Sequence, residues 1–229
     1  MDGYASLVAA CASFVGTHFL MSHPLRPRLV TGLGNGGFLG FYSLVSLSTF
    51  GWMVWSWRQA PASDYYWQPG DLIWAIASLL TLFAAVFFAG SLIGNPALPS
   101  PEVDEVEGRK LAAKSPTGMF LVTRHPMMWS FALWGVAHIL VAPRIDSFIF
   151  VGSIIFLALV GARAQETKKE RALGTGWVTW ESRTSYFPRL SQLSRIGWRL
   201  WVAGIAMWLT VTWAHNFFGP YSAGLFRWL

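Results

Sequence analysis

Apolar residues fall into six long runs that are separated by more polar stretches. A run of roughly 20 apolar residues is long enough to cross the hydrocarbon core of a bilayer as a helix. The predicted spans are residues 3–21, 37–57, 72–93, 127–142, 147–162 and 200–218, of which 127–142 and 147–162 are short. The pattern predicts an all-α integral membrane bundle of about six transmembrane helices, built as a single membrane domain over residues 1–229.

The polar stretches between these runs differ in length and in composition. Segments 94–126 and 163–199 are the longest, and the first changes from acidic to basic in a way that predicts a short surface helix. A glycine-rich run, Gly32–Gly37, lacks the strand and helix setting of a dinucleotide-binding loop and predicts a tight connection. His125-Pro126 predicts a helix entrance, because proline suits the first helical position.

Composition and charge agree with a membrane protein and set its orientation. The chain is 54% hydrophobic and only 12% charged, with 14 Trp and a net charge of +6. Of its 17 Lys and Arg residues, fourteen follow the first, third and fifth spans and three lie on the other side. The positive-inside rule therefore places 94–126 and 163–199 in the cytoplasm and both termini on the non-cytoplasmic side. The same rule accounts for the basic residues, which lie in the loops between the apolar spans. The positive net charge therefore gives no reason to expect a nucleic acid partner.

Histidines are the candidates for chemistry. No Asp, Glu, Lys or Arg lies inside the six spans, and the single Cys11 excludes a cysteine-rich metal site. His18 and His138 lie on apolar helices, where ionisable groups are candidates for function, although a lone histidine there is more often a helix–helix hydrogen bond. His138 shares an apolar stripe with Trp134. His125 and His138 point about 140° apart on one helix, so a metal bound by either needs a partner on another helix.

Several short motifs together resemble a known family. They are Thr17–Ser22 with Leu25-Arg26, then Phe41–Leu47, Thr123–Pro126 and Trp134–His138. They resemble the NnrU family of bacterial membrane proteins and its plant and cyanobacterial relative, 15-cis-zeta-carotene isomerase, over a region from His18 to about Pro188. The resemblance implies a multi-pass protein of the bacterial inner membrane that binds haem b.

The same resemblance implies roles for individual residues. The positions that match the haem ligands of the isomerases are His18 and His138. Beside what the resemblance implies, Arg124 and His125 at the helix entrance and Trp134 on the stripe of His138 are further expected cofactor-binding residues. The implied reaction is cis–trans isomerisation of a hydrophobic polyene, a carotenoid, with His18, His138 and His125 as catalytic residues. The isomerases carry a cysteine where this chain has Gly135, so a histidine-to-cysteine ligand switch is not available. The alternative implied by the family name is a non-catalytic haem protein of nitric oxide metabolism and denitrification.

Helix geometry leaves the ligand pair open. At 1.5 Å per residue, His18 lies about 6 Å from the inner end of its span, whereas His138 lies roughly 20 Å from Pro126. Either the span that carries His138 begins earlier, near Gly118, or the inner partner of His18 is His125. The remaining two, His23 and His215, are expected at the membrane interfaces.

A second resemblance supplies a third hypothesis. Thr123–Pro126 with Glu166–Leu173, Trp180–Thr184 and Phe187-Pro188 also resembles isoprenylcysteine carboxyl methyltransferase and phospholipid methyltransferases. That resemblance implies a membrane methyltransferase using S-adenosylmethionine, with Arg124 binding its carboxylate and Glu170 or Glu181 its ribose. The competing interpretation is a solvated charged segment with pairs such as Glu166–Lys169.

Overall fold

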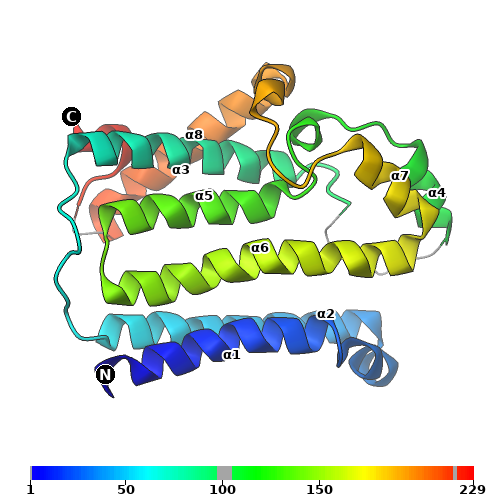
Figure 1. Cartoon of the computed structure of the whole chain (residues 1–229), viewed down its shortest axis with the longest axis horizontal. Coiled ribbons are helices and arrows are strands. Elements are labelled where there is room, and N and C mark those ends of the chain that lie inside the picture. The colour runs from blue at the N-terminus through cyan, green and yellow to red at the C-terminus, as the bar shows by residue number, and fades with distance from the viewer. Residues whose placement is uncertain (1, 97–104, 219–220) are drawn as a thin grey trace. The chain divides into compact units, whose positions relative to one another are not determined.

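The computed structural model describes residues 2–96, 105–218 and 221–229, and within them every regular element is a helix. Two compact units share the chain. The first holds the residues up to Gln68 and Ala142–Leu157, and the second holds Pro69–Val141 and Ala158–Leu229. Helix α6, Ile145–Leu173, is continuous through the boundary (Figure 1). The all-α prediction is confirmed for the described residues.

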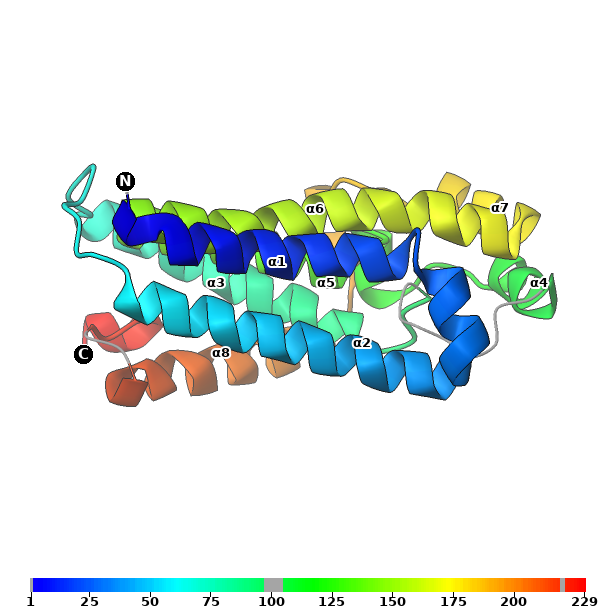
Figure 2. The same ribbon diagram turned by 90° about the horizontal axis from the view of Figure 1, so that it is seen from below.

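In the first unit, α1 (Ala5–Ser22) follows the short helix η1 (Asp2–Tyr4) and lies side by side with α2 (Arg26–Gln59), as Figure 2 shows. The two helices are tied by a hydroxyl contact between Ser6 and Ser56, 2.9 Å apart. The first part of α6 joins α2 through Trp57, whose indole nitrogen donates to Asp146 at 3.0 Å.

Helix α2 agrees only in part with the prediction for this region. A span from residue 37 was expected, preceded by a tight glycine-rich connection, but the helix begins at Arg26. Gly34 interrupts it with φ of 69°, a conformation that costs little without a Cβ atom. The glycine-rich run is therefore the place where two helical segments meet at a sharp kink, and the segment that precedes it, from Arg26, was not expected.

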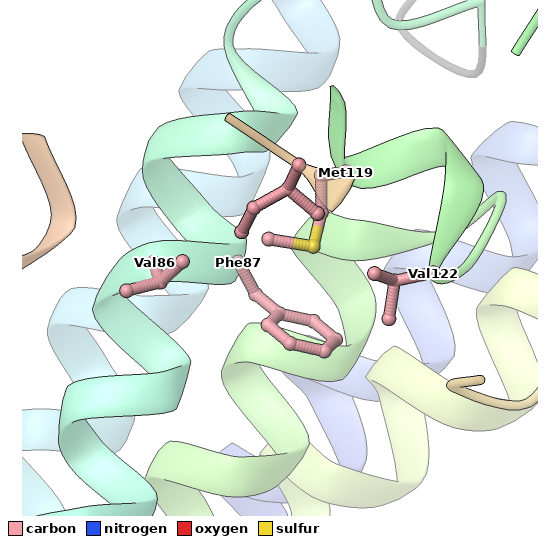
Figure 3. Close-up of a cluster of buried hydrophobic side chains, with 5 residues drawn as sticks. Val86, Phe87, Met119 and Val122 are labelled. Carbon is pink, nitrogen blue, oxygen red and sulfur yellow. The ribbon is translucent and has the colours of Figure 1, made fainter. Parts of the chain in front are cut away.

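In the second unit, α3 (Asp71–Ser91) packs against both α5 (Pro126–Val141) and α8 (Trp198–Phe218). The approach of α8 to α3 is close: a Cβ atom on Gly204 would lie 2.6 Å from Val86 Cα. Trp208 also donates from its indole nitrogen to Thr81 Oγ1 at 3.0 Å. An apolar cluster lies near the C-terminal end of α3 (Figure 3). Its members are Val86, Phe87, Met119, Val122 and Ile196.

Short helices gather beyond this cluster, and η4 (Gly224–Arg227) follows α8. They are α4 (Glu105–Ala113), η2 (Gly118–Leu121), α7 (Thr175–Arg183) and η3 (Leu190–Arg195). The predicted surface helix in segment 94–126 is thus present as α4, which packs against α7 (Figure 1). Segment 163–199 was expected to follow the end of a span, but α6 continues as a helix to Leu173.

Within the described part of the chain, four helices are long and apolar enough to cross a membrane: α1, α2, α3 and α6. Helix α5 is apolar but has only 16 residues, and α8 is not among the four. The chain has the helices of a membrane protein, while the count of six spans and the sides of the termini stay predictions. One alternative was wrong: α5 begins at Pro126, and the helix near Gly118 is the separate four-residue η2.

Candidate functional site

A cluster of buried charged side chains lies where α5 begins. Arg124 and Glu166 are each 5% exposed and His125 is 2% exposed. The Arg124 guanidinium donates to Glu166 through Nε and pairs with the same carboxylate through Nη2. Arg124 Nη2 also donates to Glu181 Oε1 at 2.7 Å, and Arg163 Nη1 donates to Glu166 Oε2 at 2.5 Å. The loop before α5, helix α6 and the last turns of α7 are therefore joined by one network of charge-assisted hydrogen bonds.

His125 belongs to this network. Its Nε2 lies 3.2 Å from Glu166 Oε1, and its ring meets Tyr186 edge to face at 5.5 Å. The other ring nitrogen, Nδ1, is buried and has no hydrogen-bond partner within the described part of the chain. His125 is thus held against a carboxylate and does not present a free Nε2 to a metal.

The backbone around Arg124 is fixed by a second segment, Thr184–Arg189. Arg124 N donates to Ser185 O at 2.8 Å, and Thr123 Oγ1 donates to Tyr186 O at 2.7 Å. The Tyr186 hydroxyl in turn donates to Leu159 O on α6 at 2.7 Å. The residue before Pro126 is barred from the helical conformation, so this extended pairing satisfies backbone groups that a helix would otherwise use.

Electrostatics follow from this packing. Glu166 lies beyond the predicted apolar span 147–162. Burial alone would raise its pKa, but the hydrogen bond from His125 and the charges of Arg124 and Arg163 outweigh it and lower the pKa to about 2. For Tyr186, burial and then the Glu166 charge raise the pKa. The carboxylate of Glu166 is therefore ionised at neutral pH and neutralised by its neighbours.

This pairing bears on the methyltransferase hypothesis. Binding the carboxylate of S-adenosylmethionine would need a guanidinium with open donors, whereas Arg124 is buried and shared between two carboxylates. Glu181 is itself engaged by Arg124. The arrangement is that of a structural ion cluster, and it gives the adenosylmethionine alternative no support.

His138 has a different environment near the end of α5. Its Nδ1 lies 2.8 Å from Trp134 O, one turn earlier, and its ring packs on the Trp134 ring at 4.3 Å. Because the carbonyl accepts from Nδ1, the proton is fixed there and Nε2 is left with its lone pair. The ring of His215 on α8 lies 6.4 Å from that of His138, with its own Nδ1 2.8 Å from Val211 O. Two imidazoles with the same tautomer thus face the same region of the second unit.

His18 lies in the first unit and repeats the pattern. Its Nδ1 lies 2.7 Å from Phe14 O, and its ring contacts the rings of Phe14 at 4.4 Å and Tyr42 at 5.4 Å. His18 and His138 therefore belong to different compact units, each prepared in the same way by a carbonyl of its own helix.

Metal-binding capacity follows from these positions. Within the described residues, no group of three or more His, Cys, Asp or Glu side chains comes together to hold an ion. A structural zinc site commonly takes four protein ligands, whereas haem iron takes one or two because the porphyrin supplies the rest. Single imidazoles with a carbonyl on Nδ1 match the second need.

Comparison with known families agrees with this arrangement of apolar helices. The family model described as NnrU protein matches residues 6–222, nearly the whole chain. The chain belongs to the NnrU family. No curated protein and no solved structure matches it. The resemblance noted in the sequence is thereby confirmed at the level of the NnrU family, whose matched region includes all five histidines.

Four residues of these sites were not among the predicted site residues: Arg163, Glu166, Tyr186 and His215. Glu166 was named in the motif that resembles the methyltransferases and in the competing solvated charged segment, but without a role of its own, and its contact with Arg124 spans 42 residues of sequence. His215 was expected at an interface, and only the fold brings it to His138. The available signal for Glu166 was its position one turn after Arg163 at the end of an apolar run.

Proposed function

We propose that this NnrU-family protein binds haem b in the bacterial cytoplasmic membrane through His138. The observation that supports the proposal is the environment of the His138 imidazole. Its Nδ1 donates to Trp134 O, and its Nε2 has no hydrogen-bond partner among the described residues. The ring packs against the Trp134 ring in apolar surroundings. A neutral imidazole with this second-shell carbonyl is a good ligand for haem iron. Trp134 supplies the aromatic ring that packs against His138.

A second side chain, His18 or His215, would hold the haem together with His138, and a different observation supports each of them. His18 matches the family resemblance and has the same tautomer as His138. His215 lies in the same unit as His138. The rings of His138 and His215 have centres 6.4 Å apart, so both side chains would be near enough to hold one haem.

Haem held by these residues would supply a redox-active iron to the site. The protein residues hold the ring nitrogens in one tautomer and exclude water with aromatic side chains. The activity within this proposal is cis–trans isomerisation of a hydrophobic polyene. Its alternative is a non-catalytic haem protein in nitric oxide metabolism.

The first test is an absorption spectrum of the purified protein, oxidised and dithionite-reduced. A reduced α band of a b haem is expected in the native protein and is lost in His138→Ala. His18→Ala and His215→Ala then identify the second ligand of the iron, because only the change of the true ligand should also remove the six-coordinate spectrum. His23→Ala is the matched control, because His23 is exposed beyond the end of α1. A protein that stays colourless after haem supplementation would overturn the proposal.

A second experiment separates the two activities. In a deletion strain, an altered ratio of carotenoid isomers supports catalysis, provided that native protein restores the ratio and His138→Ala does not. Unchanged carotenoids, together with a spectral shift of the purified haem protein on adding nitric oxide, support the non-catalytic alternative.

A further inference from the structure

A pocket of about 350 Å³ opens in the first unit where α2 ends and α6 begins. Its walls are Trp57 and Arg58 of α2, the following residues 60–62, and Arg144 and Asp146. None of these residues takes part in the proposed haem site. The pocket is therefore a separate feature of the molecule, and its polar atoms need their own explanation.

Asp146 is the central polar group of this pocket and is only 5% exposed. Its Oδ2 atom accepts from two donors, Trp57 Nε1 at 3.0 Å and Arg144 Nη2 at 3.0 Å. Its Oδ1 atom is buried and has no hydrogen-bond partner among the described residues. A buried carboxylate oxygen without a donor is costly, so the site calls for a ligand that donates.

Donors for an anion lie beside that acceptor. Arg144 has a buried Nε atom without a partner in the described part of the chain, and Arg58 is an exposed side chain on the pocket wall. Two guanidinium groups and one carboxylate give the pocket a formal charge of +1. A fitting ligand therefore carries an anionic group for the arginines and a hydrogen-bond donor, favourably cationic, for Asp146 Oδ1.

The position of the pocket indicates where such a ligand comes from. Both α2 and α6 are long and apolar enough to cross a membrane, and the pocket lies at the end of one and the start of the other. Trp55 and Trp57 lie in the last turns of α2, and tryptophan is enriched at membrane–water interfaces. The molecules present in quantity at that depth are phospholipid headgroups.

We propose that this pocket binds the phosphoethanolamine headgroup of a membrane phospholipid. The phosphate lies against Arg58 and Arg144, and the primary ammonium donates to Asp146 Oδ1. A phosphocholine headgroup has no N–H to donate, and inorganic phosphate has no cation. The pocket volume of about 350 Å³ is about twelve times the roughly 30 Å³ that one water molecule occupies in the liquid, enough for a group of this size.

The test measures lipid binding by the full chain in detergent, using native mass spectrometry with phosphatidylethanolamine, phosphatidylcholine and phosphatidylglycerol. The native protein is expected to bind phosphatidylethanolamine about tenfold more tightly than phosphatidylcholine, the effect of one charge-assisted hydrogen bond. Asp146→Asn keeps an oxygen for Trp57 and Arg144 but presents an amide to the ligand, so it removes this preference. Arg144→Gln is expected to weaken the binding of all three lipids. The control is Arg28→Gln, because Arg28 is exposed in the first turn of α2, away from the pocket at its end, and this change should not affect lipid binding.

A competition experiment on the native protein makes the test independent of how the variants fold. Soluble phosphoethanolamine is expected to displace phosphatidylethanolamine, whereas phosphocholine and inorganic phosphate should need concentrations about tenfold higher. The proposal is overturned by equal binding of the ethanolamine and choline lipids, by a preference that survives Asp146→Asn, or by equal competition from inorganic phosphate. None of these readouts involves haem, so the outcome is separate from that of the spectrum.

Discussion

His125 directly precedes α5, and His138 lies thirteen residues later, near the end of that helix. The hydrogen bonds of the two imidazoles differ. His125 has Nε2 against the Glu166 carboxylate within a charged cluster. His138 has Nδ1 on a helix carbonyl and its Nε2 beside aromatic rings. The comparison teaches that the surroundings of a histidine, and not its closeness to a motif, decide whether it can serve as a ligand.

The largest effect is expected from the charged cluster. Arg124→Ala leaves the buried Glu166 carboxylate with only His125 and Arg163, and it also frees Glu181. Removing one partner of a buried pair is strongly destabilising, here by about 3 kcal/mol. Thermal unfolding in detergent measures the loss. Arg28→Ala, an exposed arginine of equal charge, is the control, and equal stability of the two variants would show that the cluster contributes little.

Acid is expected to weaken the same cluster. Because the pKa of Glu166 is about 2 in the folded protein and about 4.5 when unperturbed, the folded state favours the ionised carboxylate. Its contribution to stability is fully present above pH 4.5 and is lost as the pH falls toward 2. Unfolding temperatures measured across this window should fall more steeply for the native protein than for Glu166→Gln. Parallel curves would contradict the assigned pairing.

Local signals in the sequence predicted some of the helices and missed contacts that depend on tertiary packing. The entrance of α5 at Pro126 was predictable, because proline fixes a helix start locally. So was α4, from its change of charge. The beginning of α2 at Arg26 was not, since glycine composition does not tell a kink from a loop. Glu166 was assigned to local pairs because i,i+3 and i,i+4 spacing is visible in sequence, while its true partner Arg124 is brought to it only by tertiary packing.

A pair of isosteric variants tests the comparison directly. His125→Gln removes one hydrogen bond to Glu166 and should lower the free energy of unfolding by about 1 kcal/mol, with the haem spectrum intact. His138→Gln should do the reverse, abolishing the haem spectrum with little effect on the haem-free protein. The two measurements are pigment content per folded protein and thermal unfolding. Loss of pigment in His125→Gln alone would reverse the assignment of the two histidines.

The smallest effect is expected from the aromatic surround of His138. Trp134→Leu keeps the helix and the carbonyl that accepts from Nδ1, but it removes the ring that packs on His138 at 4.3 Å. An aromatic contact of this kind contributes about 1 kcal/mol, so the haem-free variant should unfold only slightly more easily. Haem should still bind, because the ligand is unchanged, but its reduction potential should differ, since burial and surrounding polarity set that potential. Spectroelectrochemistry measures the difference, and an unchanged potential would place the haem away from Trp134.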